Sequence, residues 1–238
     1  MMPPPPPLLG AVFDGDDTLW STERLYDEAR ARAREIVEGA GLDGVRWESI
    51  ERDLDVERVA SHAFSPERFP GSCLLAYEAV SQSLGQIPDP AIESAVYKAA
   101  ASVFEQDPTV VAGARETLSR LRGRGVRLAL LTKGDPQVQL RRIRRSRLES
   151  CFDLVRIVPE KTPESIRDIV HSLGVNPSEA WMIGNSVRSD ILPALSAGIR
   201  AIWVNSHVWE YERAAAPPLD PRVVPVDSIS EVAPLIAQ

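Results

Sequence analysis

The sequence has little cysteine, and its two thiols, Cys73 and Cys151, stand far apart in no metal-binding or redox spacing. We expect core thiols and no disulfide, which fits a reducing cytoplasm. No run of about 18 apolar residues is present that could cross a membrane. The opening MMPPPPP has neither the basic start nor the apolar stretch of a signal peptide, and it is expected to form a short polyproline arm.

An excess of positive charge is also missing. The 238 residues carry a net charge of -7, which argues against nucleic acid or an anionic membrane as a partner. The apolar content of 44% and charged content of 26% are those of a globular protein, long enough for one large domain or two small ones. Five arginines lie between Arg141 and Arg147, and such a run on a helix is more often a solvated face than a phosphate-binding patch.

What is present begins with the stretch LLGAVFDGDDTLW at residues 8–20. Its apolar start predicts a strand buried on both faces, as in the middle of a parallel sheet. Asp14, Asp16 and Asp17 follow, at the end of the strand where open α/β sheets bind ligands. Carboxylates this close repel one another unless a cation lies among them, so the spacing predicts a hard divalent metal such as Mg2+. Gly15 allows a tight turn between the first two acids.

Other interpretations of this stretch are weaker. An aspartate-rich turn can be a solvated loop, and only partners elsewhere in the chain decide against that. A calcium-binding EF-hand loop is excluded because the motif follows a strand and its twelfth position, Leu25, carries no carboxylate. An all-helical terpene cyclase also uses closely spaced aspartates, but this chain is too short for one and opens with a strand.

The pattern after Trp20 is helical for some 85 residues. Apolar residues recur at helical spacing in four segments, with glycines ending the first and the third. Asp89 and Pro90 form a cap and first-turn pair before the fourth. The sequence therefore predicts an all-helical module with no strand. Residues that could line a substrate site around this module are Trp20, His62, Phe64, Arg68 and Tyr77, although each could equally lie in the core or at the surface.

From about Asp107, strands and helices alternate, which is typical of a parallel sheet covered on both faces. The expected strands are Val126–Leu131, Leu154–Val158, Ala180–Ile183 and Arg200–Val204, and the expected helices are Ala114–Arg122, Pro136–Leu148, Pro163–Leu173 and Val187–Ala197. The predicted fold is α/β, with a Rossmann-like core at residues 1–20 and 107–238 and a helical cap at 21–106. Such a cap can close on a substrate and exclude water.

Polar residues follow three of these later strands. Thr132 ends one, Lys161 follows the next, and Asn185 with Asp190 follows another. Each has a simpler explanation alone: a turn residue, a surface amine, or a charge favoured by a helix dipole. Together they bring an acid pair, a hydroxyl, a lysine and a further acid to one edge of one sheet.

With these residues the sequence resembles the haloacid dehalogenase superfamily, and more narrowly its phosphatases with a helical cap after the first motif. The resemblance covers nearly the whole chain. The first motif, Asp-x-Asp-x-Thr, is matched by Asp14, Asp16 and Thr18. Thr132, Lys161 and the segment 185–190 match the second, third and fourth, of which the second and third are single residues and weak alone.

The resemblance implies a role for each matched residue. Asp14 would attack phosphorus, and Asp16 would protonate the leaving alcohol and then take a proton from water. Substrate contacts would come from Gly15, Thr132, Lys133 and Lys161. Mg2+ would be held by Asp14, the Asp16 backbone carbonyl and the fourth motif, through Asn185 or Asp190. Thr18 would order the loop.

Two positions depart from the family's pattern. Asn185 stands where many relatives have an acid, so metal binding is weaker or the duty passes to Asp190. Lys133 stands where such enzymes often carry asparagine, so its ammonium either faces the substrate or points to solvent.

The leading hypothesis is a cytoplasmic Mg2+-dependent phosphatase for a small phosphorylated metabolite. The second acid, Asp16, favours this over the dehalogenases of the same superfamily, which lack it. A phosphomutase uses the same two acids and is the nearest alternative. A non-catalytic ligand-binding protein with a weakened metal site is the alternative from another class. The sequence shows neither the substrate nor the oligomeric state.

Overall fold

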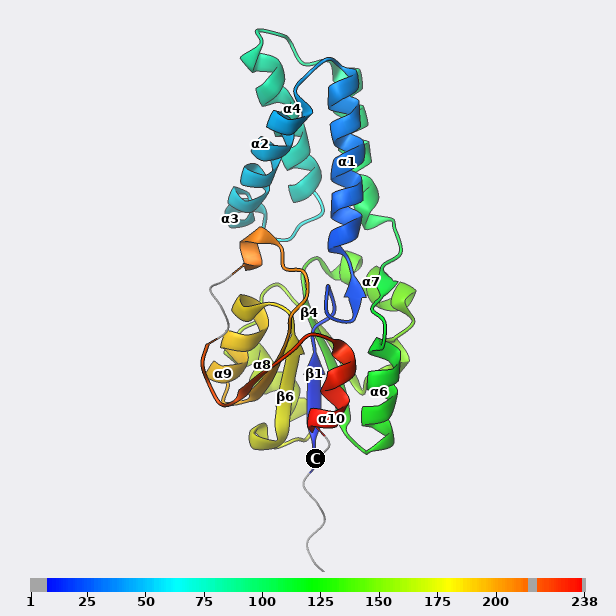
Figure 1. The fold of residues 1–238 in the computed structure, drawn as a ribbon, viewed down its shortest axis with the longest axis vertical. Coiled ribbons are helices and arrows are strands. Elements are labelled where there is room, and N and C mark those ends of the chain that lie inside the picture. The colour runs from blue at the N-terminus through cyan, green and yellow to red at the C-terminus, as the bar shows by residue number, and fades with distance from the viewer. Residues whose placement is uncertain (1–7, 214–217, 237–238) are drawn as a thin grey trace, which may run out of the picture. The chain divides into compact units, whose positions relative to one another are not determined.

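The structure, a computed structural model, describes residues 8–213 and 218–236, so the expected polyproline arm at residues 1–7 lies outside it. The described chain divides into two compact units, with boundaries between Ser21 and Thr22 and between Asp107 and Pro108. One unit is α/β and the other is helical (Figure 1). No helix within the described ranges is long and apolar enough to cross a membrane.

A parallel sheet is the centre of the α/β unit. Its six strands in the described residues have the order β5-β4-β1-β6-β7-β8, and every neighbouring pair is parallel. The bounds are β1 (Gly10–Phe13), β4 (Arg127–Lys133), β5 (Leu154–Val158), β6 (Ala180–Gly184), β7 (Arg200–Val204) and β8 (Val223–Val226). Strand β1 is buried along its whole length, as its apolar sequence predicts. The predicted α/β class with an inserted helical region is confirmed.

Helices cover both faces of this sheet. Successive side chains of β1 point to opposite faces, and because both sets are apolar, both faces have to be buried. Ala11 and Phe13 join a core cluster with α6 (Ala114–Gly123), α7 (Pro136–Ser146) and α10 (Val232–Ile236). Val12 joins the other cluster, with α8 (Pro163–Ser172) and α9 (Leu192–Ser196). Strand β1 lies between β4 and β6, so the chain crosses to opposite sides of it, which is where α/β sheets form a ligand crevice.

The helical unit consists of α1 (Glu23–Gly39), α2 (Gly44–Glu57), α3 (Val59–His62), α4 (Arg68–Ser83) and α5 (Pro90–Ala101). Within it, α1 packs on α5 and α2 packs on α4, around a core of its own that includes Trp47 and Phe69. The Trp47 indole donates to the Cys73 carbonyl at 3.0 Å. The segment is therefore a packed module, as the helical periodicity predicts.

The interior of this helical unit also holds buried charges. Arg30 donates to Glu51 Oε2 at 2.6 Å, and Arg68 pairs with Asp55. Glu51 is fully buried, and its second oxygen, Oε1, has no hydrogen-bond partner among the described residues. Burial raises the pKa of Glu51 to about 7, although Arg30 acts in the opposite direction. Arg68, a candidate to line the substrate site, is instead committed to the interior of this unit.

Several elements differ from the sequence-based expectation. A short antiparallel pair, β2 (Trp20–Ser21) with β3 (Thr109–Val110), joins the two points where the chain leaves and re-enters the α/β unit. The helix expected at Val187–Ala197 is a π-helical turn, η4 (Val187–Ile191), followed by α9. Pro193 lacks the N–H that would bond to the Ser189 carbonyl, so one regular helix cannot run through.

Two further elements near the C-terminal end, β8 and α10, were not predicted. Strand β8 is an edge strand of four residues interrupted by Pro225, which weakens its sequence signal. The remaining short turns are 3-10 helices: η1 (Ser102–Phe104), η2 (Glu149–Cys151), η3 (Pro177–Glu179), η5 (Glu210–Glu212) and η6 (Ile229–Glu231).

Candidate active site

The candidate site lies at the carboxyl ends of the central strands. Asp14 directly follows β1, and its N–H donates to the Ile183 carbonyl of β6 at 2.8 Å. Thr132 is the last residue but one of β4, and Lys161 follows β5. Because parallel strands end at the same edge, the sheet brings the four sequence motifs together.

A buried charge cluster forms the centre of the site. Lys161 Nζ donates to Asp14 Oδ1 and, at 2.6 Å, to Asp190 Oδ1. The exposed fractions of the Lys161 and Asp190 side chains are 2% and 1%, so the cluster is shielded from water. Asp190 Oδ2 accepts the Ser186 N–H at 3.0 Å. Both oxygens of Asp190 therefore have partners within the protein.

The charges in this cluster do not balance. Burial raises the pKa of Asp14 to about 7; Lys161 lowers it, whereas Asp190 and Asp16 raise it. The pKa of Lys161 is raised, because its attraction to Asp14 and Asp190 outweighs its desolvation. Two carboxylates, Asp14 and Asp190, thus share the one ammonium of Lys161, and a further cation beside Asp14 would favour its ionised form.

Thr18 shows where oxygen atoms converge. Its buried hydroxyl lies 3.1 Å from Asp14 Oδ2 and 3.2 Å from Asn185 Oδ1, so these two oxygens face one point. Asn185 Nδ2 donates to the His207 carbonyl at 2.7 Å, which fixes the amide so that its oxygen faces Thr18. In the described part of the chain no three His, Cys, Asp or Glu side chains form a metal-binding group. The oxygens of Asp14 and Asn185 are hard ligands of the kind that Mg2+ takes.

The Asp16 carboxylate is held by a separate set of hydrogen-bond donors. The Trp20 indole donates to Asp16 Oδ1 at 2.7 Å. Gln139 Nε2 and Arg142 Nη1, both from α7, lie 2.9 and 2.6 Å from Asp16 Oδ2. Trp20 is fully buried, so this candidate for lining a substrate site holds a site residue instead.

Gly15 keeps room for that tryptophan. A Cβ atom at residue 15 would lie 2.5 Å from the Trp20 ring, closer than Cβ atoms approach other atoms in proteins, so the ring would have to move. The Gly15 carbonyl also accepts the N–H groups of Leu19 and Trp20, at 2.9 and 3.2 Å. The glycine therefore fixes the loop that carries Asp16, by close packing as well as by the tight turn that the sequence suggests.

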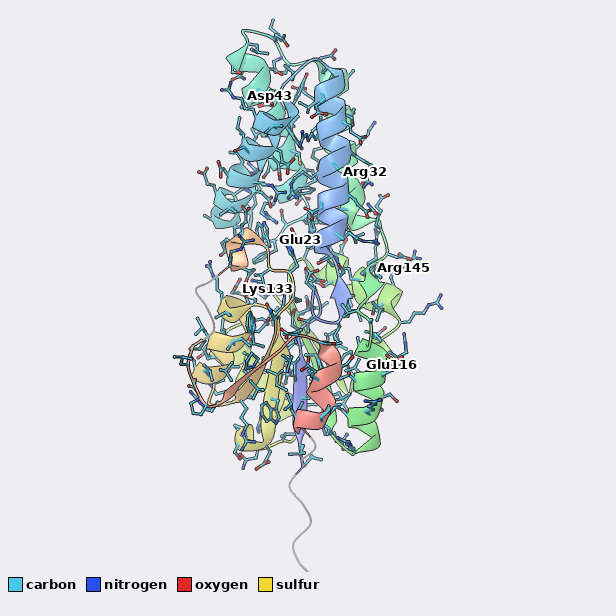
Figure 2. The ribbon with its side chains drawn as sticks, in the orientation of Figure 1. Glu23, Arg32, Asp43, Glu116, Lys133 and Arg145 are labelled. Carbon is cyan, nitrogen blue, oxygen red and sulfur yellow. The ribbon has the colours of Figure 1, made fainter. Side chains whose placement is uncertain are left out.

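The two residues at the end of β4 face different partners. The buried hydroxyl of Thr132 donates to Gln139 Oε1 at 3.3 Å. Lys133 Nζ donates to Ser189 Oγ at 2.7 Å and pairs with Glu212 (Figure 2 labels Lys133). Glu160 lies 3.6 Å from the same ammonium. The Lys133 ammonium is thus held by protein groups and does not point into solvent.

The segment at residues 205–213 contributes contacts that the sequence did not predict. Glu212 Oε2 accepts from Ser186 Oγ at 2.7 Å and from Ser189 Oγ at 2.5 Å. Although burial acts to raise it, the pKa of Glu212 is held below its usual value by Lys133 and these hydroxyls. Ser206 donates to the Asp17 carbonyl at 2.7 Å. The segment carries no motif, so only its position after β7 could have drawn attention to it.

A family model described as haloacid dehalogenase-like hydrolase matches residues 9–198. The chain therefore belongs to the haloacid dehalogenase-like hydrolases, as its motifs indicate. It is 30% identical to the glyceraldehyde 3-phosphate phosphatase of Pyrococcus abyssi, over 80% of this chain and 79% of that enzyme. Other curated relatives, which the chain matches over about half of their length, are also named as phosphatases or nucleotidases.

Solved structures share the fold. A haloacid dehalogenase-like hydrolase from Xanthomonas campestris is 23% identical with a TM-score of 0.75, covering 97% of this chain and 95% of that one. The hydrolase YfnB from Bacillus subtilis, solved with magnesium bound, is 17% identical with a TM-score of 0.65, covering 98% of this chain and 100% of that one.

Proposed function

We propose that this chain is a Mg2+-dependent phosphatase that hydrolyses a small phosphorylated metabolite through an aspartyl-phosphate on Asp14. The observation that carries the proposal is the pairing of Asp14 Oδ1 with the buried ammonium of Lys161, at the carboxyl end of the central strand. A carboxylate oriented in this way can act as a nucleophile without a helper base. The phosphatase names of the relatives support the same reaction class.

The residues around Asp14 would stabilise the transferring group. Lys161 and the Thr132 hydroxyl would donate to phosphoryl oxygens, where negative charge has to be held in a buried site. Substrate contact by Gly15 and Lys133 stays a prediction. Lys133 Nζ is bonded to Ser189 and Glu212, so a direct contact would require it to exchange one of these partners.

Asp16 would serve as the general acid and base. It would give a proton to the leaving alcohol and then take one from the water that attacks the aspartyl-phosphate. Asp16 is the less buried of the two acids, with 27% of its side chain exposed. This exposure suits a group that must exchange protons with substrate and water.

Asp14, Asn185 and the backbone carbonyl of Asp16 would hold the metal. When bound, Mg2+ supplies positive charge that offsets repulsion between Asp14 and an anionic phosphate. Asn185 Oδ1 shares the Thr18 hydroxyl with Asp14 Oδ2, whereas both oxygens of Asp190 have protein partners. We therefore assign the direct contact to Asn185 and the fixing of Lys161 to Asp190.

We assign residues 1–20 and 107–238 to the catalytic core and residues 21–106 to a cap that selects the substrate. The packed interior of the helical unit supports a separate module, since its apolar core is its own. The names of the relatives give different phosphorylated substrates, so the substrate of this chain has to be identified by assay.

The test is phosphate release from a panel of phosphorylated metabolites and an aryl phosphate, with Mg2+ and with chelator. We expect release that needs Mg2+ and is lost in Asp14→Asn. Asp17→Asn is the matched control, because it makes the same change of charge three residues further on. Asp17 takes no part in the proposed chemistry, so this variant should retain most of the activity.

Other outcomes separate the alternatives. Movement of phosphate between positions of one substrate, without release, would indicate a phosphomutase. A folded protein that acts on no compound of the panel, with or without Mg2+, would contradict the proposal and favour the ligand-binding alternative.

A further inference from the structure

Helix α7 provides two of the three donors that hold the Asp16 carboxylate. Gln139 Nε2 and Arg142 Nη1 both approach Asp16 Oδ2, at 2.9 and 2.6 Å. The third donor, Trp20 Nε1, approaches Oδ1 at 2.7 Å. Gln139 and Arg142 are both buried, so their contacts with Asp16 are shielded from competing water.

The two carboxylate oxygens of Asp16 differ in how many of their acceptor sites are occupied. A carboxylate has about four lone-pair sites, two on each oxygen. Among the residues that the structure describes, Asp16 Oδ2 has two donors, Gln139 and Arg142, whereas Oδ1 has one, Trp20. One site on Oδ1 is left to carry a proton or to receive one. The geometry thus distinguishes the two oxygens: Oδ2 is held by the protein, and Oδ1 can transfer the proton.

One arginine of the run on α7, Arg142, makes the contact with Asp16. Arg142 is buried, whereas Arg141, Arg144 and Arg145 are exposed along the same helix, and Figure 2 labels Arg145 on its outer side. Gln139 lies three residues before Arg142, on the same helix face. The run is therefore a solvated face with one exception, and the exception contacts the candidate acid.

Gln139 also joins the acid to the second motif. Its Oε1 accepts from Thr132 Oγ1 at 3.3 Å, and its Nε2 lies 3.0 Å from the Lys133 carbonyl. The amide therefore has one side on the predicted phosphate-binding hydroxyl and the other on Asp16. A shift of α7 would move both together.

We propose that Arg142 and Gln139 are positioning residues for proton transfer by Asp16, which hold Oδ2 so that Oδ1 faces the leaving oxygen. This inference rests on the proposed function. In the first step the Asp14–phosphorus bond forms, the bond from phosphorus to the leaving oxygen breaks, and the Asp16 proton passes to that oxygen. In the second, water attacks phosphorus, its proton passes to Asp16, and the Asp14–phosphorus bond breaks.

The test uses leaving groups that differ in their need for a proton. An alkyl phosphate leaves as an alkoxide that needs protonation, whereas 2,4-dinitrophenyl phosphate leaves as a stable phenolate. We expect Arg142→Met and Gln139→Met to lower the single-turnover rate on the alkyl phosphate by about 10- to 1,000-fold, the scale of general acid catalysis. The release of dinitrophenolate in one turnover should change by less than about threefold.

Three comparisons make the test specific. Arg142→Lys should recover part of the alkyl rate, because it restores a positive donor. Arg144→Met, at the exposed face of α7, should act like the wild type on both substrates. In an Asp16→Asn background, Arg142→Met should cost little more, since a residue that acts through Asp16 has nothing left to position.

An equal loss on both leaving groups, in variants with wild-type urea unfolding, would overturn the inference. So would a full additional loss in the Asp16→Asn background. Variants that unfold are replaced by Arg142→Gln and Gln139→Leu, for which the same ratio of alkyl to dinitrophenyl rates decides. A wild type that releases neither leaving group would instead refute the proposed function.

Discussion

The buried glutamate of the helical unit, Glu51, should make the stability of the protein depend on pH. Glu51 packs inside this unit with Arg30 on one oxygen, and no residue of the described chain donates to the other. Asp55 lies close enough to raise the pKa of Glu51 further. Burial is the largest effect and brings the pKa from 4.5 to about 7. The perturbation is Glu51→Gln, which keeps the shape and removes the titration.

The sign follows from proton binding. Between pH 4.5 and 7 the folded state holds a proton on Glu51 that the unfolded state has released, so stability falls as pH rises. The free energy of unfolding falls by about 1.4 kcal/mol for each pH unit between the two pKa values, and the fall levels off as the pH passes about 7. The total loss of stability from pH 5 to pH 8 is therefore about 2.5 kcal/mol. The glutamine does not titrate. The variant should therefore gain about 2.5 kcal/mol on the wild type over this range.

The assay is urea unfolding of both proteins at pH 5, 6, 7 and 8. Any constant difference reflects packing and the loss of the Arg30 partner, and only its change with pH tests the reasoning. Glu57→Gln, an exposed glutamate of the same helix, is the matched control and should give a difference that stays flat. A flat difference for Glu51→Gln as well would refute the account, because it would mean that Arg30 keeps Glu51 ionised throughout.

Two further predictions concern the α/β unit. Gly15→Ala should displace the Trp20 ring. We expect phosphate release to fall by at least about tenfold, and the free energy of urea unfolding to fall by about 1–3 kcal/mol. Unchanged activity would show that the position of the ring is not needed. Glu212→Gln should cost about 1–3 kcal/mol because Lys133 loses its buried partner, whereas Glu210→Gln, which is exposed, should cost less than about 0.5 kcal/mol in the same unfolding assay; equal effects would contradict this.

Much of the fold could be predicted because its signals are local. The buried run before Asp14 and the alternation after Asp107 define parallel strands with helices between them, and periodicity alone defines the helical module. What escaped prediction depends on tertiary context. Strand β8 is short and contains Pro225, and the π-helical turn before Pro193 has the same apolar spacing as an ordinary helix.

The candidate site divides in the same way. Residues that end strands were predicted, since a strand end fixes their place at the edge of the sheet. Gln139, Arg142 and Glu212 were not, because each makes its contact from a helix or loop to a residue far away in the sequence. The separations are 123 residues for Gln139 with Asp16, 126 for Arg142 with Asp16 and 79 for Glu212 with Lys133, and no sequence spacing reveals them. The arginine run hid one buried member among exposed neighbours.

In the proposed reaction, Asp14 carries the phosphoryl group between the substrate and water. The most direct measurement is rapid acid quench of the enzyme during turnover of a phosphorylated substrate with Mg2+, followed by mass spectrometry of the peptide that contains Asp14. We predict one added phosphoryl group on Asp14 that forms and decays at rates fast enough to account for turnover, and none in Asp14→Asn. Phosphate release by the wild type with no phosphoryl group on this peptide at any time would contradict the account.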